Sequence, residues 1–423
     1  AGQYSRMLDR SDIATPPAEG AGPRGEAPVP PPAAPRAAAR LDHKRLDRRF
    51  PSISYMEARA RRRVPRFSWD YMMGGIGEEA GIARNRRALS DVTMVPRYLA
   101  EMGGPPVLET ALLGRTWSAP FGVSPVGFGG VIWPRAPQYL ARAAAEAGLP
   151  FALSTVSTVT LEEIAAIAGP SAWYQLYAMA DPEINRAILK RARDAGYDTL
   201  LITVDVPKKM RRDHDVANGF GIPPRIDARM VLRALTCPAW CLAMAREGNP
   251  RFENIVPHMG EGLSNAEMSV KFQAERDGRV NAEKLRWYRD LWPGHLVVKG
   301  LIAPEEAVAA RDLGVDAVVV SNHGARQIDA APSVVEALPA IRAAVGPDYP
   351  LIADGAVRTG LDIMRLLALG ANFVMGGRAF YLAVGGLGEP GAAHAMHVLR
   401  EELTITMGQL GCRHARDLGD FLG

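Results

Sequence analysis

Residues 182–205 read P-E-I-N-R-A-I-L-K-R-A-R-D-A-G-Y-D-T-L-L-I-T-V-D, and this stretch decides the fold. Apolar residues recur in Pro182–Ala195 with the spacing of an amphipathic helix, and Gly196 follows where helices commonly end. Thr199–Val204 is then a short, mostly apolar run with the length of a buried strand. The stretch therefore predicts a helix that leads into a buried strand, with the carboxylate of Asp205 at the strand's end.

The same unit recurs along the chain from about residue 119. Eight short apolar runs are predicted to be strands, and most are followed by an Ala- and Leu-rich stretch with helical periodicity. The runs are Phe121–Ser124, Phe151–Ser154, Trp173–Tyr177, Thr199–Val204, His295–Lys299, Ala317–Ser321, Leu351–Ala353 and Asn372–Met375. Strands that alternate with helices imply a parallel sheet, and eight such units can close into a (β/α)8 TIM barrel. A doubly wound open sheet is the alternative.

Two segments depart from this repeat. Residues 1–40 are rich in Pro and Ala and contain no Phe or Trp, so we expect a disordered N-terminal arm over residues 1–45 and the barrel over 46–423. The gap of roughly 90 residues between Val204 and His295 indicates a large insertion after strand 4, placed at 216–290. The last helix is expected at His394–Met407.

Part of the insertion, Ile226–Glu247, mixes apolar and basic residues with Trp240. This composition is typical of a segment that lies on a membrane surface, with Trp240 at the interface and Pro238 dividing the segment into two pieces. The alternative is a lid packed on the barrel or on a neighbouring subunit.

Composition excludes several classes of protein. The chain has 423 residues with 50 Lys and Arg against 46 Asp and Glu, and a net charge of +4 does not indicate a nucleic-acid partner. Its three cysteines, Cys237, Cys241 and Cys412, cannot build a disulfide framework and suit a reducing compartment. Cys237 and Cys241 lack the further ligands of a zinc site, so we interpret them as packing residues and expect no metal.

The longest nearly apolar run, Ala234–Ala245, has 12 residues and contains Pro238. A helix needs about 20 apolar residues to span a bilayer, so we expect no transmembrane helix. The expected location is cytoplasmic, with a peripheral position on the inner face of the cytoplasmic membrane under the membrane interpretation of the insertion.

Polar side chains stand at the carboxyl ends of seven of the eight predicted strands. They are Ser154, Gln175 with Tyr177, Thr203 with Asp205, Lys299, Ser321 with His323, Asp354, and Gly377 with Arg378. Catalytic groups of (β/α)8 barrels lie at this end of the strands, so a shared site explains the pattern better than separate loop residues do.

The motif S-N-H-G-A-R-Q-I-D at Ser321–Asp329 resembles the FMN-dependent 2-hydroxy acid dehydrogenase and oxidase family. The usual family motif is S-N-H-G-G-R-Q-L-D, so this chain departs from it at Ala325 and Ile328. Further matching motifs follow in family order from about residue 45 onward: Ser68–Glu79, Ser154-Thr155, Tyr174–Tyr177, Thr203–Pro207, Met210–Asp213, Val298–Gly300, Asp354–Arg358 and Gly377–Ala379. The resemblance implies FMN as cofactor and oxidation of an (S)-2-hydroxy acid to the 2-keto acid.

His323 is the candidate base, because this oxidation removes a proton from the substrate and histidine ordinarily titrates near neutral pH. The resemblance assigns that role to His323 and implies that Asp205 pairs with its imidazole. Whether the reaction begins with abstraction of the Cα proton or with hydride transfer stays open in the sequence.

Arg326 and Arg212 are the candidate clamp for the substrate carboxylate, since a guanidinium binds a carboxylate through two parallel hydrogen bonds. The resemblance singles out Arg212 from the basic run Lys208–Arg212. It also implies that Tyr71 and Tyr177 donate hydroxyl hydrogen bonds to the substrate.

The resemblance implies a set of FMN contacts as well. Lys299 would place an ammonium beside N1 and O2 of the flavin and raise its electron affinity. The glycines and arginines that follow the last two strands would bind the phosphate. The expected set comprises Pro125, Val126, Gly127, Ser154, Gln175, Thr203, Lys299, Ser321, Asp354, Gly355, Arg358, Gly377 and Arg378. No G-x-G-x-x-G follows a strand where a dinucleotide would need it, so NAD is not expected.

Two positions bear on the substrate and the electron acceptor. Val156 stands where glycolate oxidases carry a Trp, which leaves room for lactate, mandelate or a larger 2-hydroxy acid. Gly127 replaces the Ala common in the oxidases and indicates a dehydrogenase. Membrane-bound members of the family that this chain resembles carry an insertion after the fourth strand, as this chain does, and pass electrons to quinone. The resemblance therefore implies quinone or another carrier as the electron acceptor.

The alternatives are an oxygen-using oxidase, a relative that acts on a peptide-derived substrate, and a cofactor-binding protein without catalysis. The complete set His323, Arg326, Arg212 and Tyr71 argues against the last. The expected assembly is a homotetramer or homo-octamer.

Overall fold

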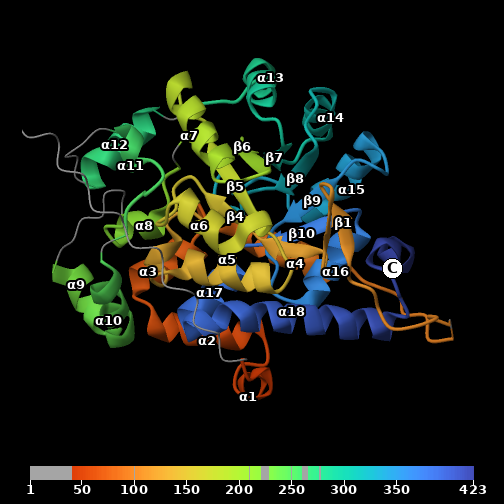
Figure 1. The fold of residues 1–423 in the computed structure, drawn as a ribbon. Helices are drawn as coiled ribbons and strands as arrows, with labels where there is room; N and C mark the ends of the chain where they lie inside the picture. The colour runs from red at the N-terminus through yellow and green to blue at the C-terminus, as the bar shows by residue number, and fades with distance from the viewer. Residues whose placement is uncertain are drawn as a thin grey trace, which may run out of the picture. The chain divides into compact units, whose positions relative to one another are not determined.

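The computed structural model describes residues 41–99, 101–208, 210–220, 228–248, 250–259, 265–275 and 278–423 (Figure 1). Residues 1–40, where the arm was predicted, lie outside the described residues. Leu41–Gly423 form one unit, and its first helix, α1 (His43–Asp47), begins inside the segment 1–45.

Eight parallel strands close into a barrel in the order β10-β3-β4-β5-β6-β7-β8-β9. The strands are β3 (Phe121–Val123), β4 (Phe151–Ser154), β5 (Ala172–Tyr177), β6 (Thr199–Thr203), β7 (His295–Leu301), β8 (Ala317–Ser321), β9 (Leu351–Asp354) and β10 (Phe373–Gly376). The closed order confirms the (β/α)8 barrel and rules out the open sheet. The register pairs Ser154 with Gln175, Thr203 with Lys299, and Ser321 with Asp354, so polar strand ends lie side by side.

Helices surround the barrel (Figure 1). Those that follow its strands are α5 (Ala136–Glu146), α6 (Leu161–Ala168), α7 (Pro182–Asp194), α14 (Pro304–Asp312), α15 (Val334–Val345), α16 (Gly360–Ala368) and α17 (Arg378–Leu387). Ahead of the barrel lie α2 (Ile53–Arg63), α3 (Arg66–Met73) and α4 (Ala80–Asp91), and short 3-10 helices form at Gly129–Val131, Gly169–Ser171 and Ala415–Phe421. The local signals are clear in α7, where Asp181 accepts from the Glu183 amide at 2.8 Å and Pro182 opens the helix.

The last helix, α18 (Glu389–Leu410), is longer than the predicted His394–Met407. Gly388 precedes it with φ of +73°, Pro390 lies in its first turn, and Gly411 ends it with φ of +82°. These residues are ordinary start and stop signals, and they place the helix boundaries outside the periodic apolar stretch.

An antiparallel hairpin of β1 (Thr110–Leu112) and β2 (Arg115–Trp117) was not predicted. Its Leu112 and Trp117 are buried in the apolar cluster that fills the barrel, where the Trp117 and Trp173 rings meet edge to face at 6.0 Å. The hairpin turn is Leu113-Gly114 with φ values of +50° and +70°. Leucine is unusual in that conformation, so the turn lacks the Asn-Gly signal by which a hairpin is normally found.

The insertion after β6, the fourth barrel strand, is confirmed. Together with the loop that leads into it, it forms α8 (Asp213–Ala217), α9 (Ala228–Leu235), α10 (Pro238–Glu247), α11 (Val256–Met259), α12 (Asn265–Glu275) and α13 (Ala282–Leu291). Helices α8 to α12 gather on one side of the barrel (Figure 1). Pro238 lies in the first turn of α10 and separates it from α9, as predicted.

Trp240 does not lie at an exposed interface, so that expectation was wrong. It is 7% exposed, its Nε1 donates to the Val131 carbonyl at 3.1 Å, and its ring packs edge to face against Phe67. Trp240 therefore anchors α10 to the barrel unit. The exposed large apolar residues of α9 and α10 are Val231, Leu232, Leu235 and Leu242. Among the described residues, no helix has the length and apolarity that a membrane span requires.

Candidate active site

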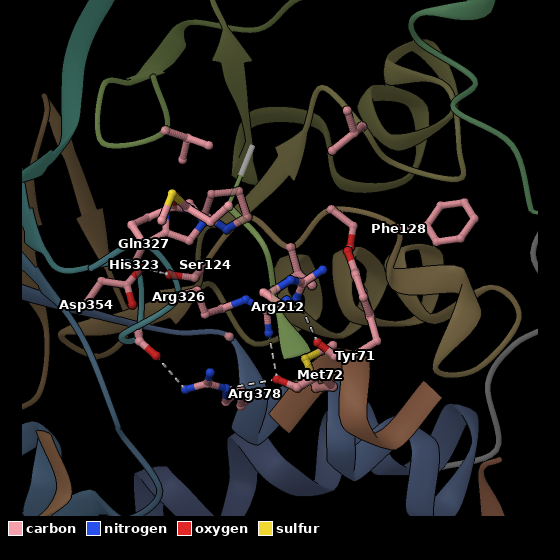
Figure 2. Close-up of a pocket in the computed structure, with 18 of the residues that line it drawn as sticks. Tyr71, Met72, Ser124, Phe128, Arg212, His323, Arg326, Gln327, Asp354 and Arg378 are labelled. Carbon is pink, nitrogen blue, oxygen red and sulfur yellow. Dashed lines mark hydrogen bonds between the residues drawn. The ribbon is translucent and has the colours of Figure 1, made fainter. Parts of the chain in front are cut away.

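A cavity of about 510 Å³ opens where the barrel strands end (Figure 2). The predicted site residues that line it are Tyr71, Pro125, Val126, Gly127, Val156, Tyr177, Arg212, Lys299, His323, Arg326, Asp354, Gly355, Arg358, Gly377 and Arg378. The other predicted residues, Ser154, Gln175, Thr203, Asp205 and Ser321, do not line this cavity; all but Asp205, whose side chain is 12% exposed, are fully buried. Thr203 instead borders a small neighbouring cavity that it shares with Tyr177.

His323 and Asp205 form a close pair, with His323 Nδ1 2.9 Å from Asp205 Oδ1. Burial by itself would raise the pKa of Asp205, but the charge and hydrogen bond of His323, with the charge of Lys299, outweigh it and lower the pKa. The carboxylate is therefore ionised at neutral pH. His323 itself has φ of +55°, so the backbone after β8 turns sharply to present the ring.

Gly300, which was not singled out from the sequence, makes room for this pair. It lies at a bulge in β7 with φ of +109°, and a Cβ there would fall 2.4 Å from the carboxyl carbon of Asp205. Any side chain at position 300 would displace Asp205, so only glycine suits the position.

Two guanidinium groups flank the ring of Tyr71 at one wall of the cavity (Figure 2). The Cζ atoms of Arg212 and Arg326 lie 4.8 Å and 5.4 Å from the ring centroid. Arg212 forms an ion pair with Asp215, and Arg326 donates to the Met72 carbonyl at 2.9 Å. Both cations are thus held in place beside the cavity, where they can meet an anionic group.

The hydroxyl of Tyr71 donates to the Gly127 carbonyl at 2.8 Å. Burial raises the pKa of this phenol to about 12, although the nearby Arg212 opposes the shift. The hydroxyl is therefore protonated throughout the physiological range and available as a hydrogen-bond donor.

Lys299 is a buried cation with partners. It is 4% exposed, its Nζ lies 3.2 Å from Asp354 Oδ2, and it donates to Ser321 Oγ at 3.0 Å. Ser124, a strand-end residue that was not among the predicted site residues, donates to the same Asp354 oxygen at 2.6 Å (Figure 2). These contacts offset the cost of burying the charge.

Gln175 has an unused donor. Its Oε1 accepts from Ser154 Oγ at 2.9 Å, while its Nε2 is buried and has no hydrogen-bond partner in the described part of the chain. A buried amide donor without a partner is costly, and a ligand with hydrogen-bond acceptors would satisfy it. The unpaired Nε2 of Gln175 is therefore an independent structural reason to expect a ligand ring with hydrogen-bond acceptors at its edge.

A second pair of arginines makes part of the cavity strongly positive, and one of them, Arg378, donates to the same Met72 carbonyl as Arg326 does. Burial and the nearby Arg358 lower the pKa of Arg378 to about 10, and burial also lowers the pKa of Arg358, which pairs with Glu57 at 3.1 Å. Gly355 and Gly377 line the cavity beside them, and α17 begins at Arg378. Two half-buried guanidiniums, one of them at the N-terminus of α17, with glycines that admit close backbone approach, suit a phosphate group.

Sequence reasoning missed the aromatic side of the cavity. Phe128, Phe220, Phe252 and Phe272 all line it and are buried. Phe128 contacts both Phe252 and Phe220, with ring centroids 5.2 Å and 6.3 Å apart, and Phe252 lies 6.1 Å from Phe272. Three of the four belong to the loop or insertion after β6, where the rule of polar strand ends does not apply.

These features define a barrel enzyme with a His–Asp couple, paired guanidiniums, an unsatisfied amide donor and an anion-binding end. The model of the FMN-dependent dehydrogenase family matches residues 60–422. The chain belongs to this family, and its cofactor is FMN. The residues described above suit the two parts of that cofactor, a polar ring edge and a phosphate.

Proteins with similar sequences and structures indicate which reaction of this family the chain performs. The chain is 39% identical over 366 residues to an L-lactate dehydrogenase of Caulobacter vibrioides, covering 86% of this chain and 94% of that protein. It is 37% identical to an L-lactate dehydrogenase of Pectobacterium atrosepticum, covering 85% and 93%. A crystal structure of the monotopic membrane protein (S)-mandelate dehydrogenase matches with a TM-score of 0.83 at 35% identity, covering 88% and 98%. The chain is accordingly an oxidoreductase that oxidises a 2-hydroxy acid with FMN.

Proposed function

We propose that the substrate is an (S)-2-hydroxy acid with an apolar side chain, from lactate up to aryl size as in mandelate. The observation that carries this proposal is the wall of four phenylalanines, two of which, Phe128 and Phe220, contact the Tyr71 ring beside the paired arginines. An apolar wall gains from burying an apolar substituent, while the small side chain of Val156 leaves room for it.

In this proposal His323 takes the substrate proton. Its Nδ1 is held by Asp205, so Nε2 is the nitrogen that receives the proton. Asp205 fixes the orientation of the ring and stabilises the imidazolium that forms. The argument holds whether the proton leaves the Cα or the hydroxyl of the substrate.

Arg212 and Arg326 would bind the substrate carboxylate. Tyr177 would donate to the substrate hydroxyl or keto oxygen. Tyr71 would donate to the carboxylate after exchanging its hydrogen bond with the Gly127 carbonyl. The charge-assisted contacts would orient the acid so that its Cα–H and hydroxyl meet His323.

FMN, when bound, supplies the acceptor for the two electrons of the oxidation. The polar edge of its ring would be bound by Lys299, Ser154, Gln175 and Thr203, and Ser321 would fix the position of Lys299. The backbone of Pro125–Gly127 would lie against the ring. Asp354 would contact the ribityl chain. Arg358, Arg378, Gly355 and Gly377 would bind the phosphate.

We further propose that the enzyme passes electrons to a membrane quinone, with α9 and α10 resting on the membrane surface. Exposed Val231, Leu232 and Leu235 of α9 lie beside exposed Arg229, and the structural relative named above is a monotopic membrane protein. A lid packed on the barrel or on a neighbouring subunit is the competing role. A homotetramer or homo-octamer would be compatible with either.

The deciding experiment is anaerobic bleaching of the bound flavin by a panel of (S)-2-hydroxy acids, including glycolate, lactate, 3-phenyllactate and mandelate. Rapid bleaching by the apolar and aryl acids, and slow bleaching by glycolate, is expected. Preferential bleaching by glycolate would overturn the substrate proposal. A second experiment compares the rates at which a quinone analogue and air reoxidise the reduced flavin. A faster rate with the quinone analogue would support a dehydrogenase, and a faster rate with air would support the oxygen-using oxidase. Activity only on peptide-linked hydroxy acids would support the third alternative.

A further inference from the structure

A second cluster of ionisable side chains lies where α1 meets α18. His397 and Glu401 stand one turn apart on α18, and Asp47 ends α1. His43 stacks on His397 with ring centroids 4.2 Å apart. None of these residues lines the active-site cavity, and the proposed reaction uses none of them.

The spacing of the three possible ligand atoms is informative. His397 Nε2 lies 3.6 Å from Asp47 Oδ2 and 3.6 Å from Glu401 Oε2. Both separations are too long for good hydrogen bonds, and Nε2 is buried with no hydrogen-bond partner among the described residues. Zinc holds nitrogen and oxygen ligands at about 2.0–2.2 Å in a tetrahedron, which places neighbouring ligand atoms roughly 3.3–3.6 Å apart. The two nitrogen–oxygen separations match edges of such a tetrahedron, and all three ligand atoms lie within 4.8 Å of one another.

The charge and access of the cluster also suit a cation. Two carboxylates and one imidazole offer two negative charges and a nitrogen ligand, a set that favours zinc over magnesium because magnesium prefers oxygen alone. The Glu401 side chain is 55% exposed, which leaves a route for the ion and room for water.

We propose that Asp47, His397 and Glu401 bind a divalent transition-metal ion, zinc in the first instance, with water completing the tetrahedron. The ion joins α1 to α18. Since α1 is the first described element of the chain, the metal fixes the start of the folded unit to its long C-terminal helix. Its role is structural and independent of the oxidation.

The test is titration of the full-length FMN holoenzyme with zinc after treatment with a chelator. One equivalent of zinc per chain should bind and raise the melting temperature. Glu401→Gln and His397→Gln should each lose that equivalent and the thermal shift. Glu401 is exposed and its replacement is isosteric, so this variant tests the site even if His397→Gln folds poorly. His414→Gln serves as the matched control and should keep the equivalent.

X-ray absorption at the zinc edge identifies the ligands of the bound ion. The expected first shell contains only nitrogen and oxygen. A shell with sulfur would assign the ion to Cys237, Cys241 or Cys412 and overturn the proposal. Failure of the wild-type protein to bind zinc, or equal binding by wild type and Glu401→Gln, would overturn it as well.

Discussion

The imidazole of His323 contacts the carboxylate of Asp205 through Nδ1 at 2.9 Å, although the two residues are 118 positions apart in the chain. The barrel register creates this proximity, because β6, β7 and β8 are neighbours and both residues follow strand ends. Gly300 on the intervening strand leaves the space in which they meet. His323 Nδ1 is thereby occupied by its contact with Asp205, and Nε2 is the nitrogen that can contact the substrate.

His323→Gln should retain FMN but lose reduction of the flavin by substrate. Removal of a general base typically costs about 10²–10⁴-fold in rate. Anaerobic stopped-flow absorbance of the flavin measures this directly, and His258→Gln, in the insertion, is the matched control. A His323→Gln rate within a factor of a few of wild type would remove His323 from the mechanism.

Arg212→Lys and Arg326→Lys should each weaken binding of the hydroxy acid and of its keto acid. An ammonium cannot reproduce the two parallel hydrogen bonds of a guanidinium, and one charge-assisted contact contributes roughly 1.5–3 kcal/mol. Titration of the flavin spectrum with the keto acid should show an affinity loss of about 10- to 150-fold.

Arg186→Lys is the control for the clamp, since the Arg186 side chain is 46% exposed, pairs with Glu183 and does not line the cavity. It should bind the keto acid as wild type does. If methyl esters of the substrate react as fast as the free acids, the clamp assignment fails.

Gly127→Ala should discriminate between substrates by size. A Cβ at position 127 would lie 2.6 Å from Val156 Cγ2, so Val156 must shift within the lining of the cavity. The value of kcat/KM should fall more for mandelate than for lactate. The double variant Gly127→Ala/Val156→Ala should recover part of the loss, because it removes the clashing methyl group. Equal losses for both acids would show that the effect is not one of space.

Tyr71→Phe tests the pH behaviour of the site. Since burial raises the pKa of Tyr71 to about 12, from 10.0 for the ordinary side chain, the hydroxyl remains a donor over the working range. The stability that the neutral phenol contributes is present below about pH 10 and is lost only as the pH rises through about 12. The ratio of wild-type to Tyr71→Phe flavin-reduction rates should therefore be constant from pH 6 to about pH 10. A ratio that falls between pH 8 and 10 would contradict the assignment.

Leu232→Glu and Leu235→Glu should release the enzyme from anionic vesicles while leaving flavin reduction by substrate intact. These side chains are 66% and 63% exposed on α9. Wild-type co-sedimentation should weaken at high salt, because surface charges are screened within about 10 Å at 0.1 M salt. Ile405→Glu, at a 58% exposed position of α18, is the control. No wild-type binding at low salt would favour the lid.

The barrel could be predicted closely because buried parallel strands are short apolar runs with little freedom of register. Ala317–Ser321 and Phe151–Ser154 have the same bounds in the prediction and in the structure. Their polar ends point to one rim by the geometry of the fold, which is why most predicted site residues converge on one cavity.

The insertion could not be predicted in this way. The positions of Phe220, Phe252 and Phe272 depend on how separate helices pack on the barrel, and no strand register fixes them. Trp240 was misjudged for the same reason: an amphipathic pattern gives the apolar residues of α10, but not which of them face the barrel. Nor does the sequence show that Gln175 Nε2 lacks a hydrogen-bond partner among the described residues, since that depends on how the neighbouring strands pack.

The hairpin β1–β2 has a consequence for the order of events in turnover. Leu112 and Trp117 pack into the apolar cluster that fills the barrel, and Met375 of the same cluster lines the cavity, so in the described part of the chain this cluster forms the base of the cavity. We therefore expect the acid, the keto acid and any acceptor that contacts the flavin to enter at the rim where the strands end, where Phe252 and Phe272 line the cavity. On that shared route a bound keto acid should slow reoxidation of the flavin by a bulky acceptor, and rapid-mixing absorbance of the flavin with and without keto acid measures this.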